Sequence, residues 1–68
     1  MANAVVRFIQ MLENDARKYD LLAKNLEKMR EDMDADQARF AAVEIRGRRD
    51  HAKMLRQLIK VTKQTHKI

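Results

Sequence analysis

The sequence predicts an all-α protein, and its composition carries that prediction. The 68 residues contain no proline and a single glycine, and most are the strong helix formers Ala, Leu, Met, Glu, Lys, Arg and Gln. No segment shows the strict alternation of apolar and polar residues that a half-buried strand requires. We therefore expect residues 1–68 to form a single helical domain, too short to enclose a large core of its own.

A heptad repeat of apolar residues predicts a long first helix over about residues 3–32. The first column recurs every seven residues at Val5, Leu12, Tyr19, Leu26 and Met33. The complementary column is expected at Phe8, Leu22 and Met29, and the seam is widened by Ile9, Ala16 and Ala23. This repeat is typical of helices that pack in the manner of a coiled coil.

A capping signal predicts a turn at about residues 33–36 and a second helix over about residues 36–66. Asp34 and, three residues later, Gln37 match a capping box, and Asp36 adds a carboxylate to the first helical turn. The apolar phase changes after this segment, to Ala38, Ala41, Ile45, Ala52, Leu55 and Ile59, joined by Met54, Leu58, Val61 and Thr62. The chain is therefore predicted to form a helical hairpin. One continuous rod is the alternative, because Phe40 and Val43 keep the phase of the first heptad.

A lone hairpin of this length buries its apolar stripes poorly. Two hairpins packed together as an antiparallel four-helix bundle would cover them, so we expect a homodimer. The residues expected in the core or the interface are Val5, Phe8, Leu12, Tyr19, Leu22, Leu26, Met29, Ile45, Leu55, Leu58 and Ile59.

Two residues interrupt the helical pattern. Asp15 falls at an apolar position, where a carboxylate is costly unless it is paired. We expect it either to pair with Arg48 or His51 across the hairpin or to lie in water at the edge of the bundle.

Gly47 costs about 1 kcal/mol relative to Ala inside a helix. It is read as a tolerated surface glycine or slight bend, with a close backbone approach or the start of a third helix as the alternatives.

The last third of the chain carries a basic stripe, spaced three and four residues apart so that one helix face holds it. Its members are Arg46, Arg49, Lys53, Arg56, Lys60, Lys63 and Lys67. Residues 1–34 hold six basic against seven acidic residues and residues 35–68 hold nine against three, so the net charge of +5 belongs to one half. The stripe predicts contact with nucleic acid or an acidic protein partner. The solvated face of a bundle helix is the alternative, and a membrane surface is unlikely because tryptophan is absent.

The remaining composition argues against catalysis and against bound cofactors. The chain has no cysteine, no serine and no glycine-rich phosphate loop, and His51 and His66 lack a metal-ligand partner one turn away. We therefore expect no catalytic residue, metal or cofactor. The expected function is that of a small cytoplasmic, non-enzymatic regulatory protein that binds nucleic acid through its basic face. The alternative is a protein-interaction adaptor, inhibitor or small chaperone subunit, and nothing in the sequence separates RNA from DNA.

Overall fold

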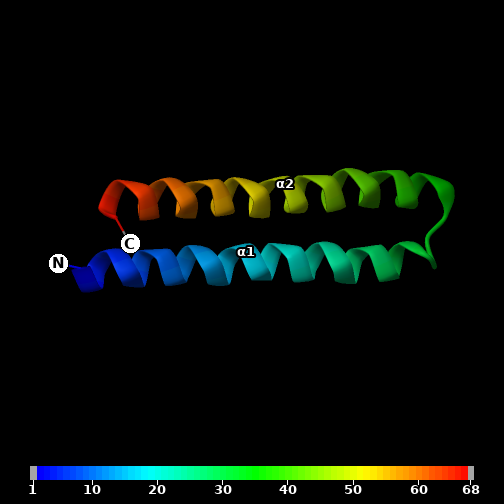
Figure 1. The fold of residues 1–68 in the computed structure, drawn as a ribbon. Coiled ribbons are helices and arrows are strands. Elements are labelled where there is room, and N and C mark those ends of the chain that lie inside the picture. The colour runs from blue at the N-terminus through cyan, green and yellow to red at the C-terminus, as the bar shows by residue number, and fades with distance from the viewer. Residues whose placement is uncertain (1, 68) are drawn as a thin grey trace.

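The computed structural model describes residues 2–67, which form two antiparallel helices joined by a short turn (Figure 1). Helix α1 spans Ala2–Arg30 and helix α2 spans Ala35–His66. The pair measures 51 × 15 × 11 Å between Cα positions, with both chain ends at one end and the turn at the other. The predicted all-α hairpin is confirmed. The continuous rod is wrong, because α2 folds back along the whole of α1.

The turn is built by backbone bonds on one side and a capping box on the other. After Arg30, the next three backbone N–H groups each bond a carbonyl three residues earlier, which tightens the end of α1 two residues before the predicted end. Asp34 begins α2: its Oδ1 accepts from the Gln37 N–H at 2.8 Å, and the Gln37 Oε1 accepts from the Asp34 N–H at 3.3 Å. The predicted capping box is therefore present, and it places the start of α2 at Ala35.

The core between the helices is narrow and rich in alanine. Its buried residues are Ile9, Leu12, Ala16, Ala23, Ala41, Ile45, Ala52, Leu55 and Ile59. Ala23 and Ala52 have no exposed surface, and side chains this small let two packed helices lie close together. Val5 and Tyr19 pack against this core from its edge. The second column of α1 that faces α2 is therefore Ile9, Ala16 and Ala23.

The column of Phe8, Leu22 and Met29 lies outside this core. Phe8 and Met29 are exposed on the hairpin and Leu22 is half-buried, because the smaller column Ile9–Ala16–Ala23 occupies the contact with α2. Leu26 is half-buried and Leu58 of α2 is exposed.

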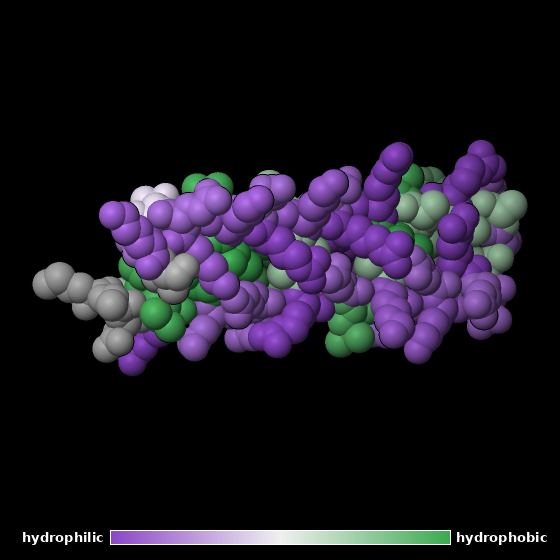
Figure 2. All heavy atoms as spheres, in the orientation of Figure 1, coloured by the Kyte–Doolittle hydropathy of each residue, from purple (hydrophilic) through white to green (hydrophobic). Residues whose placement is uncertain are grey.

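Other large apolar side chains also remain exposed, among them Met11, Leu21, Phe40, Val43, Met54 and Val61. Figure 2 shows the mixture from one side, where separate hydrophobic patches interrupt a mainly hydrophilic surface. Within residues 2–67, neither helix is long and apolar enough to cross a membrane.

The structure answers both questions that the interrupted pattern raised. Asp15 is exposed, and within the described chain it pairs with neither expected partner. Arg48 lies 3.7 Å from Glu44 on its own helix, and His51 stacks on Tyr19. Helix α2 continues unbroken through Gly47, so there is no third helix, and a Cβ atom at Gly47 would meet nothing within 4 Å. Within the hairpin, Gly47 is therefore a surface glycine.

Candidate nucleic-acid interface

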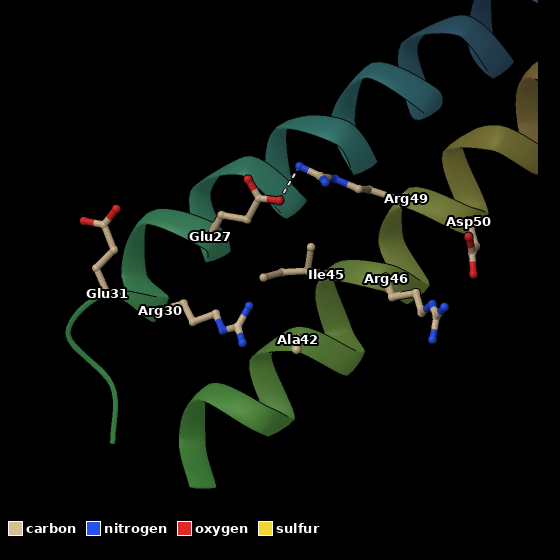
Figure 3. A pocket seen from close by; sticks show the side chains of 8 residues that line it. All are labelled: Glu27, Arg30, Glu31, Ala42, Ile45, Arg46, Arg49 and Asp50. Atoms are coloured by element: carbon tan, nitrogen blue, oxygen red, sulfur yellow. Dashed lines mark ion pairs between the residues drawn. The ribbon is translucent and has the colours of Figure 1, made fainter. Parts of the chain in front are cut away.

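Three ion pairs join the helices along one side of the hairpin, and we call them the ladder. Its rungs are Glu27–Arg49, Asp20–Arg56 and Glu13–Lys63. Each step of seven residues back along α1 is matched by seven residues forward along α2, as an antiparallel register requires. Figure 3 shows the rung nearest the turn, where Arg49 reaches across to Glu27.

The rungs are partly exposed and differ in their closeness. Arg56 Nη2 donates a hydrogen bond to Asp20 Oδ2, whereas Lys63 Nζ lies 3.6 Å from Glu13 Oε1. Exposed pairs of this kind each contribute about 0.2–1 kcal/mol. The ladder therefore fixes register more than it adds stability.

The ladder divides the predicted basic stripe into two parts. In one part, Arg49, Arg56 and Lys63 form ion pairs with acidic residues of α1. Arg46, Lys53 and Lys60 are exposed and make no ion pair within residues 2–67; we call them the α2 row. Figure 3 shows the contrast, with Arg46 extending away from α1 while Arg49 crosses to it.

Helix geometry explains this division. The residue three positions after a ladder cation is buried, as Ala52 is after Arg49 and Ile59 after Arg56. The residue four positions after it is exposed, as Lys53 and Lys60 are. A ladder cation thus stands between the core and the α2 row, within reach of α1.

Lys67, the last member of the stripe, lies just beyond the helix. It occupies the C-cap in the left-handed conformation, with φ 55° and ψ 43°. Its backbone N–H bonds the Gln64 carbonyl at 3.4 Å. Lys67 follows Lys60 by seven residues, but it lies after the last helical residue, so it adds charge at the end of α2 without extending the regular helical line of cations.

The ladder also leaves two cations of α1 without the local acid that lies four residues before them. Arg17 follows Glu13 by four residues and Lys24 follows Asp20 by four, but both acids pair across to α2 instead. Arg17 donates a hydrogen bond to Asn14 Oδ1 at 2.7 Å. We call Arg17 and Lys24 the α1 row; both are exposed.

The α1 row mirrors the α2 row on the other side of the ladder. Three residues after Glu13 and Asp20 come the buried Ala16 and Ala23, and four residues after them come the exposed Arg17 and Lys24. The ladder and both rows make up one surface, the ladder face. A shallow groove of about 230 Å³ on this face is lined by Glu13, Ala16, Arg17, Arg56 and Ile59.

The sequence signal that would have identified the ladder face is its double seven-residue spacing. Glu13, Asp20 and Glu27 recur every seven residues, as do the three cations opposite them. The correspondence is hard to recognise in the sequence, because Asp20 also lies four residues before Lys24 and could pair with it on the same helix. The α1 row was missed for the same reason.

A larger groove of about 710 Å³ lies towards the turn. It is lined by Glu27, Arg30, Glu31, Ala42, Ile45, Arg46, Arg49 and Asp50 (Figure 3). Its three arginines are balanced by three carboxylates, and one of those pairs is the Glu27–Arg49 rung. The excess positive charge therefore lies further along α2, where residues 51–67 contain no acid.

The opposite side of the helix pair has a different character. Tyr19 and His51 stack there with ring centroids 4.2 Å apart and planes inclined by 26°. A groove of about 400 Å³ beside them is lined by Tyr19, Val43, Glu44, Gly47, Arg48 and His51. The Arg48 Nε atom is buried and has no hydrogen-bond partner in the described chain.

No cluster of three or more His, Cys, Asp or Glu side chains that could hold a metal ion occurs within residues 2–67. Comparison of the chain with known protein families, curated proteins and solved structures finds no significant match in any of the three.

Proposed function

We propose that this chain is a small, cytoplasmic, non-enzymatic regulatory protein that binds nucleic acid through the basic face of α2. The observation that carries the proposal is the α2 row. Arg46, Lys53 and Lys60 remain exposed after the ladder has used the other helical cations of the stripe.

The spacing of the α2 row suits contact with a phosphate backbone. Seven residues of α-helix advance about 10.5 Å, so the row places three cations along a straight edge of about 21 Å. Each phosphate neutralised by such a cation releases counterions, which supplies affinity without reading base sequence. The ladder supports this role because it ties α2 to α1 and keeps the edge straight.

The test replaces the α2 row without touching the ladder. Lys53→Gln with Lys60→Gln removes two positive charges and keeps two strong helix formers. The control, Arg7→Gln with Lys18→Gln, makes the same change in net charge at exposed positions of α1 outside the ladder face. Reversing Arg49 and Arg56 is a poorer test, since it breaks two rungs as well.

Binding is measured by fluorescence anisotropy with a labelled 20-base-pair DNA duplex at 100 mM salt. The double Lys variant is expected to bind at least about tenfold more weakly, and the control within about twofold of the unmodified protein. Circular dichroism checks that both variants remain helical, as is expected of substitutions at exposed positions. Equal loss in both variants, or loss in neither, contradicts the proposal.

We further propose that the exposed apolar side chains join two copies of the chain into an antiparallel four-helix bundle. A hairpin face of 51 × 15 Å offers on the order of 800 Å², which is the size of one partner's share in a standard interface. Phe40 and Val43 are 75% and 70% exposed, and they gain cover only from another molecule. The narrow alanine-rich core also leaves a single hairpin with little stabilisation of its own.

Sedimentation equilibrium between 5 and 200 µM tests the dimer, with Phe40→Glu as the matched variant. Because Phe40 is exposed in the hairpin, this substitution should leave the hairpin helical while it weakens association. A monomeric unmodified protein over this range contradicts the dimer. It would favour the second candidate function, an adaptor whose apolar face docks on a different protein, and the exposed Phe40 and Val43 are the observation behind that candidate.

A further inference from the structure

We infer that the ladder face binds double-stranded nucleic acid and contacts the phosphates of both strands. Arg17 and Lys24 of α1 contact one strand, and Arg46, Lys53 and Lys60 of α2 contact the other. This inference rests on the proposed function and extends the binding surface to a helix outside the basic stripe. It follows from how charge is distributed across the ladder face.

The face carries positive charge along two parallel edges. The α1 row and the α2 row lie on opposite sides of the ladder. Arg17 and Lys24 each follow a ladder acid by four residues, and Lys53 and Lys60 each follow a ladder cation by four residues. Two backbones that border a groove of a duplex present two lines of phosphates. A single strand presents one line, which a single cationic edge is enough to neutralise.

The strip between the two edges is electrically balanced. Each ladder cation there is matched by an acid, and the acids Glu13, Asp20 and Glu27 are themselves about 40% exposed. A phosphate placed over the middle of the face would meet these carboxylates as well as their partners. The favourable positions for phosphates are therefore the edges, with the groove of the duplex over the middle.

The ladder face lacks the aromatic surface that single strands use. Binding of single strands commonly combines a basic groove with aromatic side chains on which bases stack. Tyr19 is stacked on His51 outside the ladder face, and Phe8 lines a groove with Val61 and Thr62 near the chain ends. Within residues 2–67, neither groove of the ladder face has an aromatic residue in its lining.

The ladder holds the two edges at a fixed separation. Its rungs occur at three levels of the hairpin, and Ala16, Ala23 and Ala52 allow the helices to pack closely between them. A rigid pair of charged edges can meet a duplex without paying for the ordering of a flexible segment. This favours the regular backbone spacing of a duplex over a flexible strand.

The experiment compares two double variants on two ligands. Arg17→Gln with Lys24→Gln neutralises the α1 row, and Lys53→Gln with Lys60→Gln neutralises the α2 row; each removes two charges. Both are titrated by anisotropy at 100 mM salt against a labelled 20-base-pair DNA duplex, the same strand alone, and an RNA duplex of equal length. The Arg7→Gln, Lys18→Gln protein again serves as the control for net charge.

The expected result is selective loss. The α1-row variant should lose about tenfold or more in duplex affinity and change less than about twofold on the single strand, while the α2-row variant weakens binding to both. Equal effects of the α1-row variant on duplex and single strand, or no effect on either, overturn the inference while leaving the proposed function intact. If the unmodified protein binds none of the ligands, the proposed function itself fails. If the unmodified protein binds duplexes, its relative affinity for the DNA and RNA duplexes identifies which of the two the ladder face prefers.

Discussion

Arg56 of α2 donates a hydrogen bond to Asp20 of α1 across the hairpin, over a sequence separation of 36 residues. This contact is the middle rung of the ladder, with Glu27–Arg49 on one side and Glu13–Lys63 on the other. It joins two helices whose buried contact includes four alanines among its nine residues. The three rungs therefore have two effects. They join the two helices, and they determine which cations of the basic stripe remain without an acidic partner.

The Asp20–Arg56 rung should give a small but measurable coupling energy. A double-mutant cycle with Asp20→Asn and Arg56→Gln is expected to yield about 0.2–1 kcal/mol, as found for exposed ion pairs. Urea unfolding of the four proteins measures it, and the coupling should shrink in 1 M salt. An equivalent cycle on Asp15 and Arg56 is the control. Coupling of equal size in both cycles would contradict a specific rung.

Replacing Gly47 by alanine should stabilise the hairpin. Helix α2 is regular at this position and the added methyl meets nothing within 4 Å, so the gain is the helix propensity of about 0.5–1 kcal/mol. Thermal and urea unfolding measure the change. Sedimentation of the same variant tests whether Gly47 contacts a second copy: unchanged association is expected if it does not. A less stable monomeric variant would show that the surface at Gly47 is not open.

Removing the cap of α2 should destabilise the protein. Asp34→Ala deletes the carboxylate that accepts from the Gln37 N–H, at an expected cost of about 0.5–2 kcal/mol. Asp34→Asn is the matched variant, since asparagine caps almost as well, and it should retain most of the stability. Urea unfolding compares the three proteins. A full loss in Asp34→Asn would point to the charge of Asp34 in place of its capping bond.

Enlarging a buried alanine should be costly. Ala52 has no exposed surface and lies where the helices meet, so Ala52→Leu is expected to lower the free energy of unfolding by about 1–3 kcal/mol through overpacking. Ala4→Leu is the control, because Ala4 is exposed near the start of α1. Both substitutions insert the same group into a helix. Stabilisation by Ala52→Leu would indicate that the helices have room to separate.

Much of the fold could be predicted because its causes are local. The capping box at Asp34 and Gln37 lies within four residues, and the change in apolar phase after it distinguished a hairpin from a rod. The choice of core column depended on more distant information. Phe8, Leu22 and Met29 have larger apolar side chains than Ile9, Ala16 and Ala23, although Asp15 interrupts their column. The packing of α2 against α1 selects the smaller side chains.

The candidate interface also depends partly on the local sequence and partly on the packing of the two helices. The sequence by itself determined that α2 carries a regular line of cations, since helical periodicity alone puts them on one face. Only the tertiary structure decided which of them are used: Arg49, Arg56 and Lys63 are drawn into the ladder, and Arg46, Lys53 and Lys60 are left exposed. The physical reason is that an acid such as Asp20 pairs with whichever cation packing brings within reach, and packing brought one from the other helix.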